Sequence, residues 1–502
     1  MAASAEGLIK SPPLPVSEHS LWKAVILCVS YANLCFVNVW TDLSNRHLGF
    51  FRKQPFSQQE LMAVSFDILL FALLLWIPIC LVTRFGNRRS KLILKGCALV
   101  GMIIPLNALR KSILATVPSL PKLTSLPLRI LLVLACVTAG IFLIARKGHL
   151  AGKALSAILL LLSPIMPVVV ARCSWDIYTN PPIEKPLAKF LPQAAGAPHL
   201  LWFIFDEWDE ALSFTRRPAN LELPELDRWR AGSFYASDAF SPNRDTIVSV
   251  PSLVAGKTFV DKELAGSDEL LMTYDRKQPA QRLTAQPSIF SQALSMGFNV
   301  GIAGNYLPYC RLFSSTTCDW HCNVEFHPQE WEYPLSVGQL MTLFARRQVR
   351  TIPLALRFGL DLPVDAVSEE SLVGATYRQI RDAALRSVVD PRLNLVFIHW
   401  DIPHPPGKFD ANTGEFANGP SRTYLDNLKL VDLTVRDIRL ALGRIGRWDD
   451  STILITSDHP LRLDHWDSSA LAPASAGRLT QGSTVPFILK LAGQNEGFTY
   501  AK

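Results

Sequence analysis

Long apolar runs dominate the first third of the chain, and short apolar stretches separated by polar turns dominate the rest. Five runs have about the ~20 residues needed to cross a hydrocarbon layer. They are Leu21 to Trp40, Leu61 to Phe85, Leu92 to Leu109, Leu128 to Ala145 and Ala154 to Ala171. The pattern predicts a polar tail over residues 1–20 and an all-α transmembrane bundle of five helices over residues 21–175.

The predicted orientation follows from the positions of Lys and Arg. With a cytoplasmic amino terminus, the inner loops carry slightly more basic residues than the outer ones, as cytoplasmic loops do. The inner set is Arg84, Arg88, Arg89, Lys91, Arg146, Lys147 and Lys153, and the outer set is Arg46, Arg52, Lys53, Arg110, Lys111 and Lys122. An odd number of crossings then places the carboxyl-terminal part outside the cytoplasm.

Charge and cysteine content agree with the predicted membrane topology. The net charge of +7 is modest, and no basic block with interleaved aromatic residues indicates nucleic-acid binding. Cys310, Cys318 and Cys322 crowd into one short stretch, where an oxidising compartment would favour a disulfide. A zinc knuckle that includes His321 is the alternative, and the pairing cannot be read from sequence.

A Pro-rich polar stretch over residues 176–198 indicates a linker, and residues 199–502 have the pattern of an α/β domain. Apolar runs predict three buried strands, His199 to Phe205, one from Leu393 to about His399, and one within Ser451 to Ser457. Apolar residues at helical spacing predict a helix from Tyr424 to Ile445.

Two of these strands end in residues able to bind a divalent cation. Asp206 and Glu207 follow the first strand, and Asp458 and His459 follow the last. Open α/β sheets bind ligands at the carboxyl ends of their strands, and carboxylate oxygen with imidazole nitrogen suits a metal such as zinc. Either strand end alone would more often be a capped end or a loop carboxylate.

Candidate groups for chemistry lie between these strand ends in the sequence. A turn over Ser241 to Asp245 precedes a short apolar helix that we expect to end near Gly256, which puts Thr246 at its amino end, where the helix dipole favours an anion. The alternative is that Asp245 or Thr246 is only an N-cap. In the loop after the strand that begins at Leu393, His404 is better positioned than His399 to contact a phosphoryl oxygen or protonate a leaving group.

Taken together in this order, these motifs resemble the sulfatase branch of the alkaline phosphatase superfamily over roughly His199 to Leu491. The chain is most similar to membrane-bound phosphoethanolamine transferases and lipoteichoic acid synthases, which also have five amino-terminal membrane helices. Their Thr-x-x-Ser-x-Pro around a threonine nucleophile is similar to Thr246-Ile-Val-Ser-Val-Pro251.

The resemblance implies a fold, a site and a reaction. It implies a sulfatase-like catalytic domain on the periplasmic side of a bacterial inner membrane, with Asp206, Glu207, Thr246, Asp458 and His459 at a metal and His404 at the phosphoryl group. Zinc fits this set of histidine and carboxylate ligands, and manganese and magnesium are the alternatives. It implies transfer of a phospho-headgroup, phosphoethanolamine or phosphoglycerol, from a phospholipid donor through Thr246 to an envelope glycan or lipid acceptor.

Two positions depart from the family pattern, and other functions stay open. Pro460 replaces the usual glycine after Asp-His, and Thr484 stands where the transferases often have another histidine, which puts a second metal in doubt. The alternatives are hydrolysis of phosphate or sulfate esters, and a non-catalytic membrane protein that binds glycans or lipids. Sulfatases use a formylglycine made from Cys or Ser, so Thr246 argues against sulfate chemistry.

Overall fold

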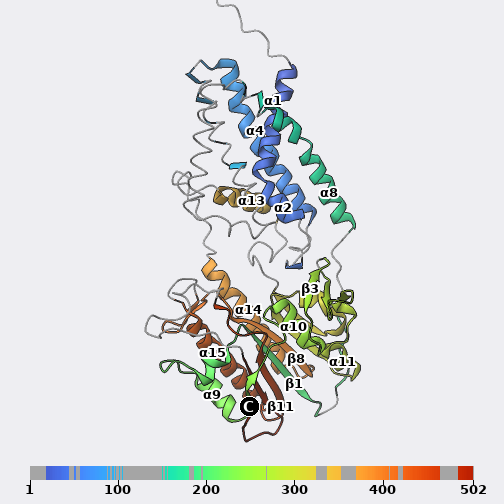
Figure 1. The fold of residues 1–502 in the computed structure, drawn as a ribbon, viewed down its shortest axis with the longest axis vertical. Helices are drawn as coiled ribbons and strands as arrows, with labels where there is room; N and C mark the ends of the chain where they lie inside the picture. The colour runs from blue at the N-terminus through green and yellow to red at the C-terminus, as the bar shows by residue number, and fades with distance from the viewer. Residues whose placement is uncertain are drawn as a thin grey trace, which may run out of the picture. The chain divides into compact units, whose positions relative to one another are not determined.

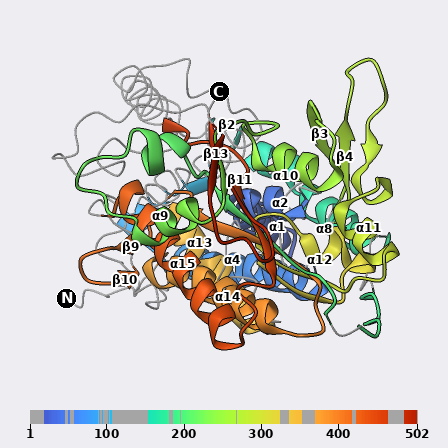
Figure 2. The same ribbon diagram turned by 90° about the horizontal axis from the view of Figure 1, so that it is seen from below.

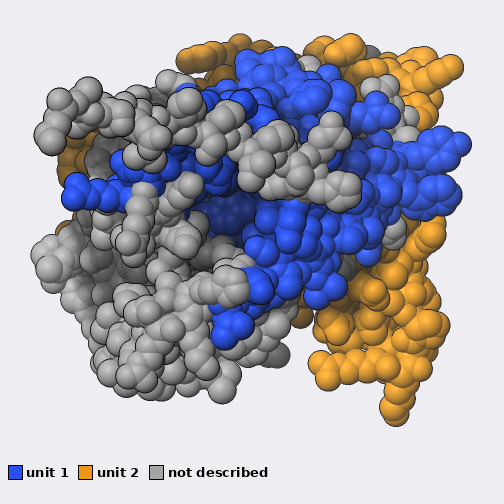
Figure 3. All heavy atoms as spheres, turned by 90° about the horizontal axis from the view of Figure 1, so that it is seen from above, with its two compact units in different colours: residues 1–45, 56–181, 334–362 blue, residues 46–55, 182–333, 363–502 orange. Residues whose placement is uncertain are grey.

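A computed structural model of the chain divides into two compact units, coloured separately in Figure 3. Unit 1 comprises residues 1–45, 56–181 and 334–362, and unit 2 comprises residues 46–55, 182–333 and 363–502. The structure describes residues 18–44, 50–51, 57–87, 156–179, 186–193, 196–266, 268–323, 336–351, 369–405, 407–416, 422–463 and 484–500, with scattered positions between 89 and 154.

The described elements of unit 1 are all helices. Its helices are α1 (Glu18–Cys35), α2 (Val37–Ser44), α4 (Gln58–Phe85), α8 (Ile165–Thr179) and α13 (Val337–Thr351), and α4 packs against α1, α8 and α13. Ser57 starts α4 with a capping box, because its hydroxyl accepts from the Glu60 N–H and the Glu60 carboxylate accepts from the Ser57 N–H at 2.7 Å.

Among the described residues, two helices are long and apolar enough to cross a membrane, Gln58–Phe85 and Ser156–Thr179. They coincide with the second and fifth predicted membrane segments. The first predicted segment corresponds to α1 and α2, which meet near Phe36. The third segment is described only at scattered positions, and the fourth lies outside the described residues.

Unit 2 is built on an eight-stranded sheet in the order β13-β2-β12-β11-β1-β8-β6-β7. Its central strands are parallel, and β12 is antiparallel to both β11 and β2. The strands are β1 (His199–Asp206), β2 (Phe234–Ala239), β6 (Val300–Asn305), β7 (Asp319–Asn323), β8 (Leu395–Pro403), β11 (Ser451–Ser457), β12 (Val485–Lys490) and β13 (Phe498–Tyr500). The three predicted strands are thus the three adjacent strands β11, β1 and β8.

Helices cover both faces of this sheet (Figures 1 and 2). On one face lie α9 (Pro224–Ala231), α14 (Glu369–Val389) and α15 (Tyr424–Arg444); on the other lie α10 (Thr246–Ala255), α11 (Ile289–Ser295) and α12 (Tyr309–Leu312). Side chains of β8 alternate between the faces, with Val396 and Ile398 in the core under α14 and α15 and Phe397 in the core under α11.

Shorter elements complete unit 2. A π-helix, Ala211–Thr215, follows β1, and two 3-10 turns cover Leu283–Ala285 and Ser314–Thr316. Two small antiparallel sheets consist of β3 (Asp261–Leu264), β4 (Leu270–Thr273) and β5 (Gln281–Arg282), and of β9 (Phe409–Asp410) and β10 (Glu415–Phe416). Cys318 is a buried free thiol, Cys310 is half-buried, and the side chain of Cys322 lies outside the described residues.

The segment from Arg46 to Pro55 belongs to unit 2 although it lies between α2 and α4 in the sequence. Phe50 is fully buried in the core under α10 and α12, and its carbonyl oxygen accepts a hydrogen bond from Arg311 Nη2 at 2.6 Å. The ring of Phe51 lies 5.2 Å from that of Tyr306, centroid to centroid. Unit 2 is therefore assembled from separate stretches of the chain.

Candidate active site

The carboxyl ends of β1 and β11 bring three of the predicted metal ligands together. The two strands are parallel with Phe205 paired to Ser457, so that the next residues, Asp206 and Asp458, leave the sheet side by side. One ligand atom each from Asp206, Asp458 and His459 lies within 4.8 Å of the others, and all three side chains are buried. This cluster has the composition of a site for one divalent cation.

The imidazole of His459 presents a lone pair to this cluster. Its Nδ1 lies 2.9 Å from the carbonyl oxygen of Pro460, which can only accept, so Nδ1 carries the hydrogen. Its Nε2 lies 3.5 Å from Asp206 Oδ1 and 3.4 Å from Asp458 Oδ2. Burial lowers the pKa of His459, which keeps the ring neutral and able to bind a metal. The backbone carbonyl of Pro460 thus fixes the tautomer of His459.

Thr246 directs its hydroxyl at the same cluster. It is the first residue of α10, and its Oγ1 lies 3.2 Å from His459 Nε2 and 3.5 Å from Asp206 Oδ1. Asp245 has the N-cap position, but its side chain makes no capping hydrogen bond. One turn later, Ser249 donates to the carbonyl oxygen of Asp458 at 2.5 Å, which fixes α10 against the end of β11. Gly256 ends α10 with φ 62°, as its left-handed C-cap.

The charges in this cluster favour a bound cation. Burial raises the pKa of Asp206 well above its usual range, and the nearby carboxylates of Asp458 and Glu207 raise it further. Burial also opposes ionisation of Asp458, yet His459, His399 and hydrogen bonds hold its pKa below the usual range. Among the described residues, Asp458 Oδ2 has no hydrogen-bond partner of standard geometry. A divalent cation would compensate these buried carboxylates, and the mixed oxygen and nitrogen donors fit zinc.

Glu207 contributes its backbone to the cluster, but its carboxylate points elsewhere. Its N–H donates to Asp458 Oδ1 at 3.1 Å, and its carbonyl oxygen accepts from the Tyr424 hydroxyl at 2.9 Å. Its φ of 66° is in the left-handed region, which is uncommon for a residue with a side chain. The carboxylate accepts from the backbone N–H of Arg462 at 2.9 Å and from its Nη2 at 3.3 Å.

His404 lies beside this carboxylate, whereas His399 is turned into the core. His404 Nδ1 donates to the carbonyl oxygen of Pro405 at 2.7 Å, and Nε2 lies 3.8 Å from Glu207 Oε2 and 3.4 Å from Arg462 Nη2. Burial lowers the pKa of His404 to about 3, so Nε2 is an acceptor at neutral pH. His399 is fully buried, with Nδ1 2.7 Å from the Tyr309 hydroxyl.

Sequence reasoning missed three residues that support this site. Arg462 follows His459 by three positions, and Ser457 precedes Asp458 directly. Tyr306, with φ 72°, precedes α12, and burial and then the nearby carboxylate of Asp206 raise the pKa of its phenol. The sequence signal that could have identified Arg462 is its position, because a charged residue three positions after an Asp-His pair is close enough to reach the same site. Thr484, at the position of the transferases' additional histidine, accepts a backbone hydrogen bond from Glu210 through its carbonyl oxygen.

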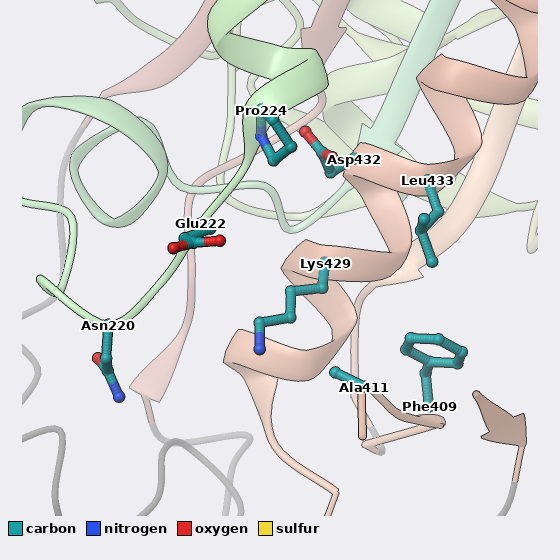
Figure 4. Close-up of a pocket in the computed structure, with 8 residues that line it drawn as sticks. All are labelled: Asn220, Glu222, Pro224, Phe409, Ala411, Lys429, Asp432 and Leu433. Atoms are coloured by element: carbon teal, nitrogen blue, oxygen red, sulfur yellow. The ribbon is translucent and has the colours of Figure 1, made fainter. Parts of the chain in front are cut away.

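A separate cavity of about 300 Å³ opens beside α15 in unit 2 (Figure 4). Lys429, Asp432 and Leu433 of α15 line it with Glu222 and Phe409. Asp432 Oδ1 already accepts from the backbone N–H of Leu226 at 2.8 Å. None of the predicted site residues lines this cavity.

The sequence profile of the sulfatase family matches residues 198–497, which is more than half of the chain. The chain belongs to the sulfatase family. The match covers β1 through β12 and includes every residue of the cluster. This confirms the predicted α/β sulfatase-like domain. No protein with a curated description matches the sequence.

Several solved structures resemble this sulfatase-family chain in fold. The phosphonate monoester hydrolase of Agrobacterium radiobacter shares 13% identity over 60% of this chain and 70% of its own, with a TM-score of 0.36. The PsFucS1 sulfatase from Pseudoalteromonas sp. shares 16% identity over 60% and 64%, with a TM-score of 0.40. Ps i-CgsB bound to k-i-k-neocarrahexaose shares 14% over 61% and 69%, with a TM-score of 0.41. These likenesses concern the fold alone.

Proposed function

We propose that this sulfatase-family protein is a membrane-anchored, metal-dependent transferase. It moves a phospho-headgroup, phosphoethanolamine or phosphoglycerol, from a phospholipid to a glycan or lipid of the cell envelope through a covalent intermediate on Thr246. The observation that carries the proposal is the hydroxyl of Thr246 at 3.2 Å from His459 Nε2 and 3.5 Å from Asp206 Oδ1. A hydroxyl among metal-ligand atoms at a helix amino terminus suits attack on a phosphoryl group.

The metal would be held by Asp206, Asp458 and His459 together with the oxygen of Thr246. A threonine hydroxyl is a poor nucleophile at neutral pH, and a bound divalent cation would favour its alkoxide. Asp206 and His459 orient the hydroxyl, and Ser249 holds α10 against the strand that carries Asp458. The side chains thereby orient Thr246 before substrate arrives.

In the first half-reaction, Thr246 Oγ1 loses its proton and bonds to phosphorus, and the bond from phosphorus to the diacylglycerol oxygen breaks. That oxygen takes up a proton and leaves as diacylglycerol. In the second, an acceptor hydroxyl bonds to phosphorus and displaces Thr246, which regains a proton. A phosphoryl anion beside His404 would favour the protonated ring, which would then contact the phosphoryl oxygens or protonate the leaving oxygen.

A lipid donor also gives a reason for the membrane anchor. We propose that the chain crosses the inner membrane of a bacterium five times and carries its catalytic unit on the periplasmic side. The apolar helices Gln58–Phe85 and Ser156–Thr179 support this proposal by length and composition. Tethering confines an enzyme to the bilayer surface and raises its effective concentration relative to headgroups.

The test uses the full-length protein in detergent micelles with zinc and a phospholipid that carries an isotope-labelled headgroup. The proposal predicts release of diacylglycerol and a labelled adduct, detected by intact-protein mass spectrometry and mapped to Thr246. The Thr246→Ala variant should form no adduct, and Thr246→Ser should keep a hydroxyl and form one. An adduct that persists in Thr246→Ala would refute the mechanism.

A second measurement separates transfer from hydrolysis. After the adduct has formed, lipid and glycan acceptors are added one at a time, and the label is followed to water or to the acceptor. Label on an acceptor supports the transferase, whereas release only as free phospho-headgroup would mean that the protein is a hydrolase of phosphate esters. Asp458→Asn, which removes one charge from the cluster, serves as the metal-deficient control.

A further inference from the structure

We propose that Arg462 binds the phosphoryl anion in this site, and that Glu207 holds Arg462 in position instead of ligating the cation. The inference rests on the proposed function, because it assumes that the substrate is a phosphate ester. It concerns two side chains of unit 2 that contact each other directly. The chemical class of the ligand is a phosphate mono- or diester, or inorganic phosphate itself.

The first argument is where the guanidinium of Arg462 lies. Nη2 is 3.3 Å from Glu207 Oε2 and 3.4 Å from His404 Nε2, and Nη1 is 3.7 Å from Asp245 Oδ1. Glu207 adjoins the metal-cluster residue Asp206, and Asp245 adjoins the nucleophile Thr246. The guanidinium therefore lies at the edge of the cluster, between the end of β1, the start of α10 and the histidine loop.

The second argument is the hydrogen-bonding capacity that Arg462 leaves unused. A guanidinium has five N–H donors in a planar fork that matches phosphate oxygens. Most of the side-chain contacts of Arg462 are long, 3.4 Å or more, and its buried Nε has no hydrogen-bond partner among the described residues. The side chain is 13% exposed, so a ligand can reach it while most water is excluded. A charge in such surroundings interacts more strongly than one in bulk water.

The third argument is the balance of charge. Asp206, Asp458 and Glu207 are three buried carboxylates, and when ionised they exceed the charge of one divalent cation. Such a site would repel a phosphodiester anion. The positive charge of the Arg462 guanidinium offsets this excess. The cationic side chain of Arg462 thus allows a negatively charged phosphate ester to bind beside the negatively charged carboxylates.

The fourth argument is how firmly Glu207 is oriented. Its backbone makes two hydrogen bonds: the N–H donates to Asp458 Oδ1, and the carbonyl oxygen accepts from the Tyr424 hydroxyl. Its backbone φ is left-handed, and its carboxylate faces Arg462. Both carboxylate oxygens accept from Arg462, one from the backbone and one from the guanidinium. Unusual backbone conformations of this kind are maintained where the surrounding structure requires them. Glu207 is accordingly a positioning residue.

The experiment measures binding of inorganic phosphate to the full-length, zinc-loaded protein by isothermal titration calorimetry, with zinc content and thermal midpoint recorded for each variant. Arg462→Gln should weaken phosphate binding by about 10- to 100-fold, the range for loss of charge-assisted hydrogen bonds. Arg462→Lys, which keeps the charge but not the fork, should lose less. Glu207→Gln should weaken phosphate binding and retain zinc, whereas Asp458→Asn should lose zinc.

The matched control is Arg217→Gln. Arg217 forms a two-pronged ion pair with Asp227, at 2.7 Å for both nitrogens, and its side chain is 17% exposed. Its hydrogen bonds within the described residues go to Asp227 and to the carbonyl oxygen of Ser213. This variant should bind phosphate like the wild type. The inference is overturned by wild-type phosphate affinity in Arg462→Gln, or by zinc loss in Glu207→Gln as complete as in Asp458→Asn.

Two further outcomes are informative. If Arg462→Gln does not fold, the test depends on Glu207→Gln. Weaker phosphate binding by this variant with retained zinc supports the inference, and loss of its zinc overturns the inference. If the wild type binds phosphate through Arg462 but forms no adduct on Thr246 with phospholipid, the proposed function fails while the assignment of Arg462 stands. If the adduct forms and Arg462→Gln binds phosphate normally, the inference fails and the proposed function stands.

Discussion

Replacing Ser457 by alanine should weaken both the fold and the metal site, because its hydroxyl joins the ends of β1 and β11. Ser457 Oγ accepts from the backbone N–H of Trp208 at 2.9 Å. It lies 2.7 Å from the carbonyl oxygen of Phe205 and 2.8 Å from that of His459, and donates its single hydrogen to one of them. The side chain is buried.

The expected magnitude follows from these contacts. A buried N–H left without an acceptor costs about 1–3 kcal/mol, and loss of the donated hydrogen bond adds about 1 kcal/mol. Ser457→Ala should therefore lower the free energy of unfolding by about 2–4 kcal/mol. Because the hydroxyl also orients the peptide that carries Asp458 and His459, zinc affinity should fall by about 10- to 100-fold, as when a group supporting metal ligands is removed.

The assay compares Ser457→Ala with Ser252→Ala. Ser252 is also buried, accepts from the backbone N–H of Phe259 at 3.1 Å and donates to the carbonyl oxygen of Val248 at 2.7 Å. Denaturant unfolding in detergent should show similar destabilisation of both variants, and a competition assay with a zinc chelator should show weaker zinc binding only in Ser457→Ala. Unchanged zinc affinity in Ser457→Ala, or equal loss in both variants, would refute the reasoning.

Three other predictions concern residues around the sheet. Asp458→Asn should lower zinc affinity by at least the ~10–100-fold expected for a supporting group, measured as metal content after dialysis; full retention would remove Asp458 from the ligand set. Lys408 Nζ lies 2.8 Å from the buried carboxylate of Asp401, so Lys408→Met leaves that carboxylate without its ion-pair partner. The free energy of unfolding, measured with denaturant, should fall by about 3–5 kcal/mol, and the double variant with Asp401→Asn should recover part of the loss. Burial, then the charge of Arg447, lowers the pKa of His199 to about 4. The contribution of the neutral His199 ring to folding stability is complete above pH 6.5. About 3 kcal/mol of it is lost as the pH falls toward 4, because the unfolded chain takes up the proton first. The thermal midpoint should therefore fall less steeply over that pH range in His199→Gln than in the wild type.

The apolar pattern and the strand ends allowed much of unit 2 to be predicted. Runs of Ile, Leu and Phe identified β1, β8 and β11 because buried parallel strands need apolar side chains on both faces. Once these strands are parallel and adjacent, Asp206 and Asp458 have to emerge at one edge. The start of α10 at Thr246 and its end at Gly256 also followed from local sequence.

The direction of individual side chains could not be predicted in the same way. Glu207 adjoins Asp206 in sequence, but its left-handed backbone turns its carboxylate to Arg462, and no periodicity signals such a conformation. Arg462 lies in an irregular loop, where contacts depend on tertiary packing. In unit 1, apolar length identified Gln58–Phe85, whereas the fourth predicted segment remains a prediction.

The position of Phe50 has a practical consequence for anyone who wishes to study the catalytic part by itself. A fragment that begins after α8 would lack this fully buried ring, and removal of a buried phenylalanine side chain costs about 3–5 kcal/mol. Such a truncated protein would be prone to aggregate through the vacated apolar pocket. A synthetic peptide spanning Arg46 to Pro55, added in trans or fused through a short flexible tether, would be the rational way to restore solubility.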